Sequence, residues 1–141
     1  MIERYTNPEM GNIWSDQAKY QTWLDVEIAA CEANCKLGKI PKSAMETIRT
    51  KASFKPERIL EIEEEVRHDV IAFLTNVNEY VGDAGRYIHV GMTSSDVLDT
   101  GLALQLKSSV KLLRKELLLL EEAIRDLARQ HKKTVMIGRS H

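Results

Sequence analysis

The chain has 141 residues, of which 43% are hydrophobic, and this supplies enough apolar material for the core of one domain. Lys and Arg number 20 against 21 Asp and Glu, so a net charge of −1 gives no general field that would attract nucleic acid or an anionic membrane. The chain contains no run of about 20 apolar residues, the length needed to span a bilayer, and it does not begin with a signal-peptide pattern. We therefore expect neither nucleic-acid nor membrane partners, and any recognition of anions must be local.

The first long helix is expected between Ser15, a suitable N-cap, and Gly38, a suitable stop. Its apolar residues cover a broad arc, so this helix should pack between neighbours. Two stripes form the arc: Leu24, Ile28, Cys31 and Cys35, and then Trp23, Val26, Ala30, Ala33 and Leu37. The two cysteines match neither a redox motif nor a zinc motif. We expect them to be reduced core residues, as in a cytoplasmic protein.

Three shorter helices follow, over residues 41–51, 56–66 and 69–82. Proline suits the first position of a helix, and Pro41 and Pro56 are expected there. Asp69 is expected to cap the third helix, which glycines end. The apolar stripe of that helix consists of Val70, Leu74, Val77 and Val81.

A much longer helix is predicted from Ser94 to about Lys132, roughly 58 Å in length. Its apolar positions alternate spacings of three and four, as in the seam of a helical bundle. The seam consists of Ala103, Leu106, Val110, Leu113, Leu117, Leu120, Ile124 and Leu127. Other helices must cover it, either from sequence absent here or from other copies, so we expect a homo-oligomer.

The predicted fold class is all-α. We expect residues 1–92 to form a small amino-terminal helical domain and residues 93–141 to begin a central helical-bundle domain. The segment "TVMIGRSH" should be extended and end in a polar turn. An ending at His141 without a cap or polar tail leads us to expect a truncated chain.

The start of the long helix, "HVGMTSSDVLDT", is unusually polar. Gly91 leaves room for a ligand, Thr93 can form a capping box with Asp96, and the amides of the first turn carry partial positive charge. Hydroxyls and amides together can bind a carboxylate without a lysine. Capping of the helix alone is the competing explanation for these residues.

Other polar residues are candidates for a site. An Arg fork beside a phenol, as in Arg4 and Tyr5, suits phosphate. His68, His89 and His141 lie beside charged or glycine-containing turns, where histidine can transfer protons near neutral pH. Their spacing matches no compact metal motif, so no metal site is predicted. His131 falls in the last turn of the long helix and is expected to be structural.

Four motifs in order, "RYTNPEM", "RHDV", "HVGMTSSDVLDT" and "GRSH", resemble the adenylosuccinate lyases of the fumarase and aspartase superfamily. The resemblance implies cleavage of adenylosuccinate to AMP and fumarate, and of the succinyl-carboxamide ribotide in purine synthesis, by β-elimination. It also implies a homotetramer with active sites shared between subunits, and no metal or organic cofactor. The catalytic base in that family is a serine of a loop that this chain lacks.

The same resemblance assigns roles to residues of this chain. The two catalytic candidates are His141, which resembles the acid that protonates the departing nitrogen, and His68. The remaining roles concern the substrate's carboxylates, its phosphate and its nucleotide. Thr93 and Ser94 resemble the contacts to the carboxylates, and Arg4 and Tyr5 those to the phosphate. Arg67, His68 and Asp69 resemble the residues that hold the nucleotide. His89 and Ser140 are expected to line the same pocket.

Two other functions are open at this point. One is a helical oligomerisation or adaptor module in which the long helix is the functional part. Clustering of Arg, His and Ser motifs at turns argues against it, because an adaptor has no need of them there. The other is a related lyase that releases fumarate from a different substrate. Only the "TSSD" form of the motif argues against this alternative.

Overall fold

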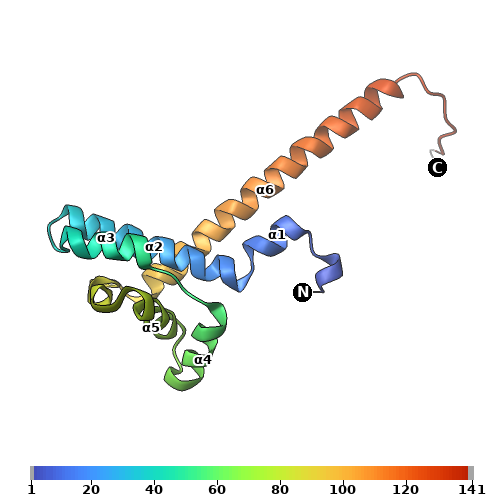
Figure 1. Cartoon of the computed structure of the whole chain (residues 1–141). Helices are drawn as coiled ribbons and strands as arrows, with labels where there is room; N and C mark the ends of the chain where they lie inside the picture. The colour runs from blue at the N-terminus through green and yellow to red at the C-terminus, as the bar shows by residue number, and fades with distance from the viewer. Residues whose placement is uncertain (1, 140–141) are drawn as a thin grey trace.

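The computed structural model describes residues 2–139 and contains helices but no strand within them, which confirms the all-α class. The middle helices of the chain and the start of the longest one form a cluster from which the rest of that helix projects (Figure 1). No described helix is long and apolar enough to cross a membrane. The elements in chain order are η1 (Glu3–Tyr5), α1 (Pro8–Ile13), α2 (Asp16–Lys36), α3 (Lys42–Lys51), α4 (Pro56–Val66), α5 (Asp69–Val81), η2 (Gly82–Tyr87) and α6 (Ser94–Gln130).

The helix ends follow the predicted signals with two exceptions. The Ser15 hydroxyl accepts a hydrogen bond from Ala18 N–H at 3.1 Å, as expected of an N-cap. Pro41 is the N-cap of α3 and not its first residue. The prediction that Asp69 caps α5 is wrong: His68 is the cap, and its Nδ1 accepts from Ile71 N–H at 3.4 Å. The extended backbone of His68 places the first helical residue at Asp69.

Four aromatic rings form the centre of the core. Tyr20 stacks on Phe73 with ring centroids 6.0 Å apart, and Trp23 meets Phe73 edge-on at 5.6 Å. Phe54 closes the group from the segment before α4. The broad apolar arc predicted for α2 is therefore buried near its middle, whereas Leu37 at its end is 70% exposed.

The first half of α6 packs on α2 and α1 through one residue per turn. These residues are Val97, Gly101, Gln105 and Ser109, all buried. A Cβ at position 101 would lie 2.8 Å from Cδ1 of Trp23, so glycine allows the two helices to approach closely. The Gln105 amide donates to the Ile13 carbonyl at 2.8 Å and joins α6 to the end of α1.

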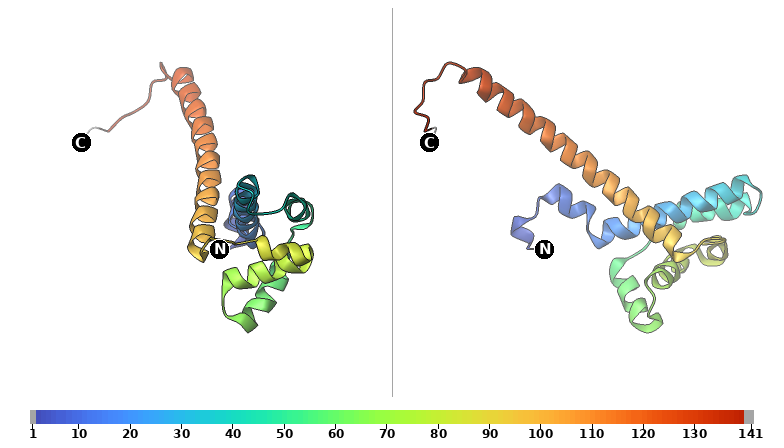
Figure 2. Two further views of the ribbon diagram at one scale, coloured as in Figure 1. Left: turned by 90° about the vertical axis from the view of Figure 1, so that its left-hand side faces the viewer. Right: turned by 180° about the vertical axis from the view of Figure 1, so that it is seen from behind.

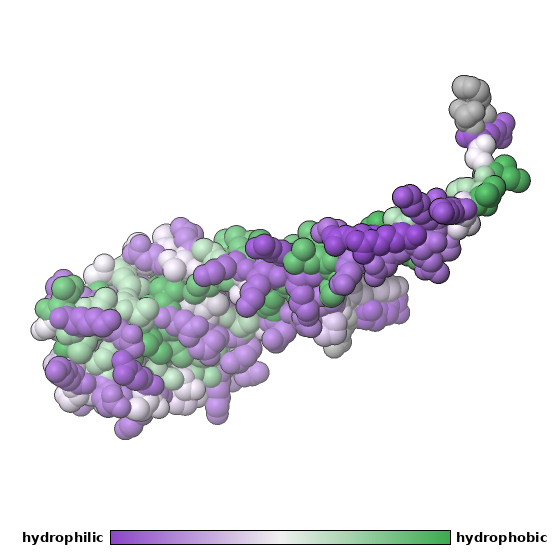
Figure 3. All heavy atoms as spheres, turned by 90° about the horizontal axis from the view of Figure 1, so that it is seen from above, coloured by the Kyte–Doolittle hydropathy of each residue, from purple (hydrophilic) through white to green (hydrophobic). Residues whose placement is uncertain are grey.

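Beyond this contact α6 leaves the cluster. The helix has 37 residues and is about 56 Å long. The leucine seam is exposed: Val110 is 61% exposed, Leu117 64% and Leu127 57%. Seen from above, hydrophobic side chains lie between the charged ones along the projecting part and at its outer end (Figure 3). Nothing within residues 2–139 covers this face.

Candidate active site

A tight turn between η2 and α6 positions His89. Ile88 is buried and anchors the turn, while His89 and Gly91 take the left-handed conformations φ 67° and φ 79°. A positive φ is uncommon for a residue with a side chain, so the surrounding structure must hold His89 in place. The imidazole turns back onto α2, where its Nδ1 lies 2.6 Å from Oε1 of Glu27.

Glu27 is the partner that the sequence analysis missed. It lies on the buried face of α2, four residues after Trp23 and four before Cys31, and is 1% exposed. Burial raises the pKa of the Glu27 carboxyl above its ordinary value, and the facing His89 acts in the opposite direction. A carboxylate within an apolar helical stripe was the available signal, because such a group requires a partner when it is buried.

The start of α6 forms the predicted capping box. Thr93 is the N-cap, and the Asp96 carboxylate accepts a hydrogen bond from its N–H at 2.8 Å. Ser94 and Ser95 begin the helix, and within residues 2–139 their hydroxyls make no hydrogen bond. Capping therefore explains Thr93 and Asp96 but leaves two hydroxyls at the positive end of the helix without a structural role.

The turn between α4 and α5 holds the second group of candidates. Arg67 ends α4 with φ 55° and is exposed, beside a depression that Leu60, Glu63 and Glu64 also line. The His68 ring caps α5 through Nδ1, which also lies 3.4 Å from Oδ1 of Asp69. Its side chain is 46% exposed, so the ring is open to a ligand or to another protein chain.

Arg4 and Tyr5 lie in η1, where the guanidinium carbon sits 4.9 Å from the centre of the phenol ring. This end of the chain runs beside the projecting part of α6, away from the α4–α5 turn (Figure 2). Among the described side chains, no hydrogen bond or ion pair joins Arg4 or Tyr5 to the α4–α5 turn or to the turn before α6. Ser140 and His141 lie outside the described residues.

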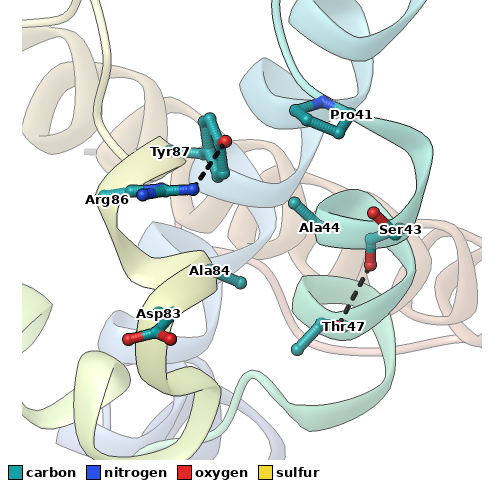
Figure 4. A pocket seen from close by; sticks show the side chains of 8 residues that line it. All are labelled: Pro41, Ser43, Ala44, Thr47, Asp83, Ala84, Arg86 and Tyr87. Atoms are coloured by element: carbon teal, nitrogen blue, oxygen red, sulfur yellow. Dashed lines mark hydrogen bonds between the residues drawn. The ribbon is translucent and has the colours of Figure 1, made fainter.

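A further depression separates α3 from η2 and contains none of the predicted site residues (Figure 4). Ser43, Thr47 and Asp83 line it, and Arg86 beside them donates to the Tyr87 hydroxyl at 3.1 Å. Among the described residues, no group of His, Cys, Asp and Glu could hold a metal ion.

Cys31 behaves as the buried core thiol that the sequence predicted. Its Sγ lies 3.6 Å from the Tyr87 carbonyl, and it is 1% exposed. Burial raises the pKa of the thiol to about 11, with the nearby Glu27 acting in the same direction. A thiol in this state is a poor nucleophile near neutral pH.

The fold recurs in solved lyase structures. Fumarate lyase from Mesorhizobium sp. BNC1 superposes with a TM-score of 0.84 at 29% identity, over 96% of this chain and 33% of that one. The 3-carboxy-cis,cis-muconate lactonizing enzyme from Pseudomonas putida gives 0.86 at 30% identity with the same coverage. An all-helical cluster extended by one long helix is thus shared with about a third of each of these enzymes.

Residues 3–141 match the profile of a family described as Lyase, and the chain belongs to that family. Over its whole length the chain is 69% identical to the adenylosuccinate lyase of Synechocystis sp. (strain ATCC 27184 / PCC 6803 / Kazusa) and 49% identical to that of Bacillus subtilis (strain 168). It spans about a third of the length of these curated relatives, 33% in both cases. The resemblance noted in the four motifs is confirmed.

Proposed function

We propose that these 141 residues are part of an enzyme that cleaves adenylosuccinate to AMP and fumarate, and the succinyl-carboxamide ribotide to its amide and fumarate. The observation that carries this proposal is the 69% identity, over the whole chain, to a protein named adenylosuccinate lyase. In the following, full-length enzyme means a chain of the relatives' length that contains these residues.

The polar groups suit this substrate. Adenylosuccinate carries two carboxylates and a phosphate, so its site needs several separate groups that bind anions. The free hydroxyls at the start of α6 lie beside amides with partial positive charge, and His89 lies in the turn just before them. On this basis we assign Ser94 to the carboxylates of the succinyl group, and with it Thr93, the neighbouring N-cap, to which the resemblance gives the same role.

The other binding residues reach the substrate through assembly. Arg4 and Tyr5 are assigned to the phosphate, and Arg67, His68 and Asp69 to the nucleotide. In one chain these two groups lie apart, because η1 lies beyond α1 along the projecting part of α6, whereas the α4–α5 turn belongs to the helical cluster (Figure 2). A homotetramer whose active sites combine residues of several subunits explains how separated groups can serve one substrate.

The reaction is a β-elimination. A base removes the proton from the carbon beside a carboxylate, the electron pair forms the double bond of fumarate, and the C–N bond breaks. An acid protonates the departing nitrogen so that it leaves as a neutral amine. We assign that acid to His141, with His68 as the second catalytic candidate, and the base to a serine outside these 141 residues.

The experiment that tests this function follows the release of fumarate from adenylosuccinate by the full-length enzyme. Steady turnover is expected. The 141 residues alone should give none, because the assigned base lies elsewhere. Rapid turnover by the 141-residue chain would show that the base has been assigned wrongly.

Replacing Ser94 with Ala separates anion binding from capping. The cap is Thr93, so Ser94→Ala should change the free energy of unfolding by less than about 0.5 kcal/mol. Loss of a hydrogen bond to a charged group costs about 1.5–3 kcal/mol, so kcat/KM should fall by about 10- to 100-fold. Thermal melting and steady-state kinetics on the same protein measure the two effects.

The matched control is Ser108→Ala on the same helix, whose hydroxyl bonds only to the Leu104 carbonyl at 3.0 Å. It should leave kcat/KM unchanged. If the kinetics of Ser94→Ala are unaltered as well, the start of α6 is not part of the active site.

A further inference from the structure

The contact between Glu27 and His89 joins residues 62 positions apart and ties the turn before α6 to the middle of α2. Among the residues whose burial the structure describes, Glu27 is the one buried carboxylate. Its Oε2 has no hydrogen-bond partner there, so the carboxylate is not held by a network of its own. An apolar side chain would fill this place in the core at lower cost, which makes a carboxylate here informative.

Among the described residues, only one nitrogen of the His89 imidazole has a hydrogen-bond partner. Nδ1 faces Glu27 at 2.6 Å, a short distance typical of a charge-assisted hydrogen bond. The ring directs Nε2 away from Nδ1, and 20% of the His89 side chain is exposed. A carboxylate that accepts from one ring nitrogen fixes the orientation of the ring and thereby the direction of the other nitrogen.

We propose that Glu27 is a positioning residue of the active site, whose carboxylate accepts from His89 Nδ1–H and presents Nε2–H to an anionic group of the substrate. This inference rests on the proposed function. It adds a residue that touches no substrate but determines how His89 does. The left-handed backbone of His89 and the buried Ile88 also fix the position of the His89 ring, in addition to its contact with Glu27.

The test is Glu27→Gln in the full-length enzyme. Glutamine keeps the size and an oxygen acceptor but removes the charge. Inhibition constants for AMP and for fumarate report on the phosphate and carboxylate parts of the site separately. At least one of them should rise about tenfold or more, which identifies the anion that His89 binds. Unchanged constants for both inhibitors would overturn the proposal.

Stability distinguishes positioning from a structural role. His89 and Cys31 are the titratable groups facing Glu27. Because the pKa of Glu27 is raised on folding, its contribution to stability is full below the ordinary pKa of 4.5 and is lost as pH rises. At pH 8 the Tm of Glu27→Gln should therefore equal or exceed that of the unmodified enzyme, and the difference should shrink toward pH 4.5. A lower Tm, or failure to fold, contradicts the proposal.

A double-mutant cycle tests whether Glu27 acts through His89. In a His89→Gln background, Glu27→Gln should not change the inhibition constants further, whereas independent roles would give multiplicative effects and overturn the proposal. Asp25→Asn removes a carboxylate from the exposed face of the same helix and serves as the control. Turnover by the unmodified enzyme tests the proposed function itself, so the two can fail separately.

Discussion

Replacing His141 with Gln in the full-length enzyme is expected to lower kcat by about 10²- to 10⁴-fold, the usual contribution of a general acid. An amine leaves poorly unless it is protonated as its bond breaks, and an imidazolium can supply that proton near neutral pH. Glutamine keeps a polar side chain of similar reach but has no proton to give. Substrate should still bind, so a substrate-binding assay on the variant should show little change.

The control for this variant is His131→Gln. His131 is the C-cap of α6, and its Nδ1 lies 3.1 Å from the Thr134 hydroxyl. Its replacement should lower stability slightly, through the helix dipole, and leave kcat unchanged. If His141→Gln instead loses affinity and keeps its kcat, His141 is a binding group, and His68 and His89 become the candidates for the acid.

The second large effect is expected from substitutions that disrupt assembly through the exposed seam of α6. Leu117 and Leu120 are 64% and 55% exposed in the single chain. If other copies cover them, replacing both with Glu places two unpaired charges in an apolar interface, at a cost of several kcal/mol. Association of the full-length enzyme should weaken by at least about 10³-fold. Sedimentation velocity over a range of concentrations measures this.

Leu37→Glu is the matched control, since Leu37 is 70% exposed at the end of α2 and lies off the seam. It should leave the sedimentation profile unchanged. A stable monomer of the unmodified full-length enzyme would contradict the tetramer and, with it, the explanation of how Arg4 and the α4–α5 turn serve one site.

Local signals in the sequence were sufficient to predict most of the fold. Ser15, Gly38 and Pro56 marked helix ends correctly, because capping and the proline ring act within a few residues. The capping box of Thr93 and Asp96 was predicted for the same reason. The Asp69 cap was wrong because Asp and His can both accept from a first-turn amide, and only the backbone conformation of His68 decides between them.

Long-range contacts could not be predicted. The partnership of Glu27 with His89 depends on a left-handed histidine that no pattern indicates. The face of α6 that packs on α2 is likewise unmarked by hydrophobicity, since it consists of small and polar residues such as Gly101 and Gln105. Close approach of two backbones favours small side chains, whereas periodicity detects large apolar ones. The leucine seam therefore indicated where α6 needs partners and not where it contacts its own chain.

In the most direct test of the proposed activity, the full-length enzyme is incubated with adenylosuccinate and, separately, with 3-carboxy-cis,cis-muconate, the compound in the name of the Pseudomonas putida relative. We expect release of fumarate and AMP in equal amounts from adenylosuccinate and no turnover of the muconate. Turnover of the muconate by a folded enzyme that leaves adenylosuccinate intact would contradict the proposal and assign the chain to a different reaction within the same fold.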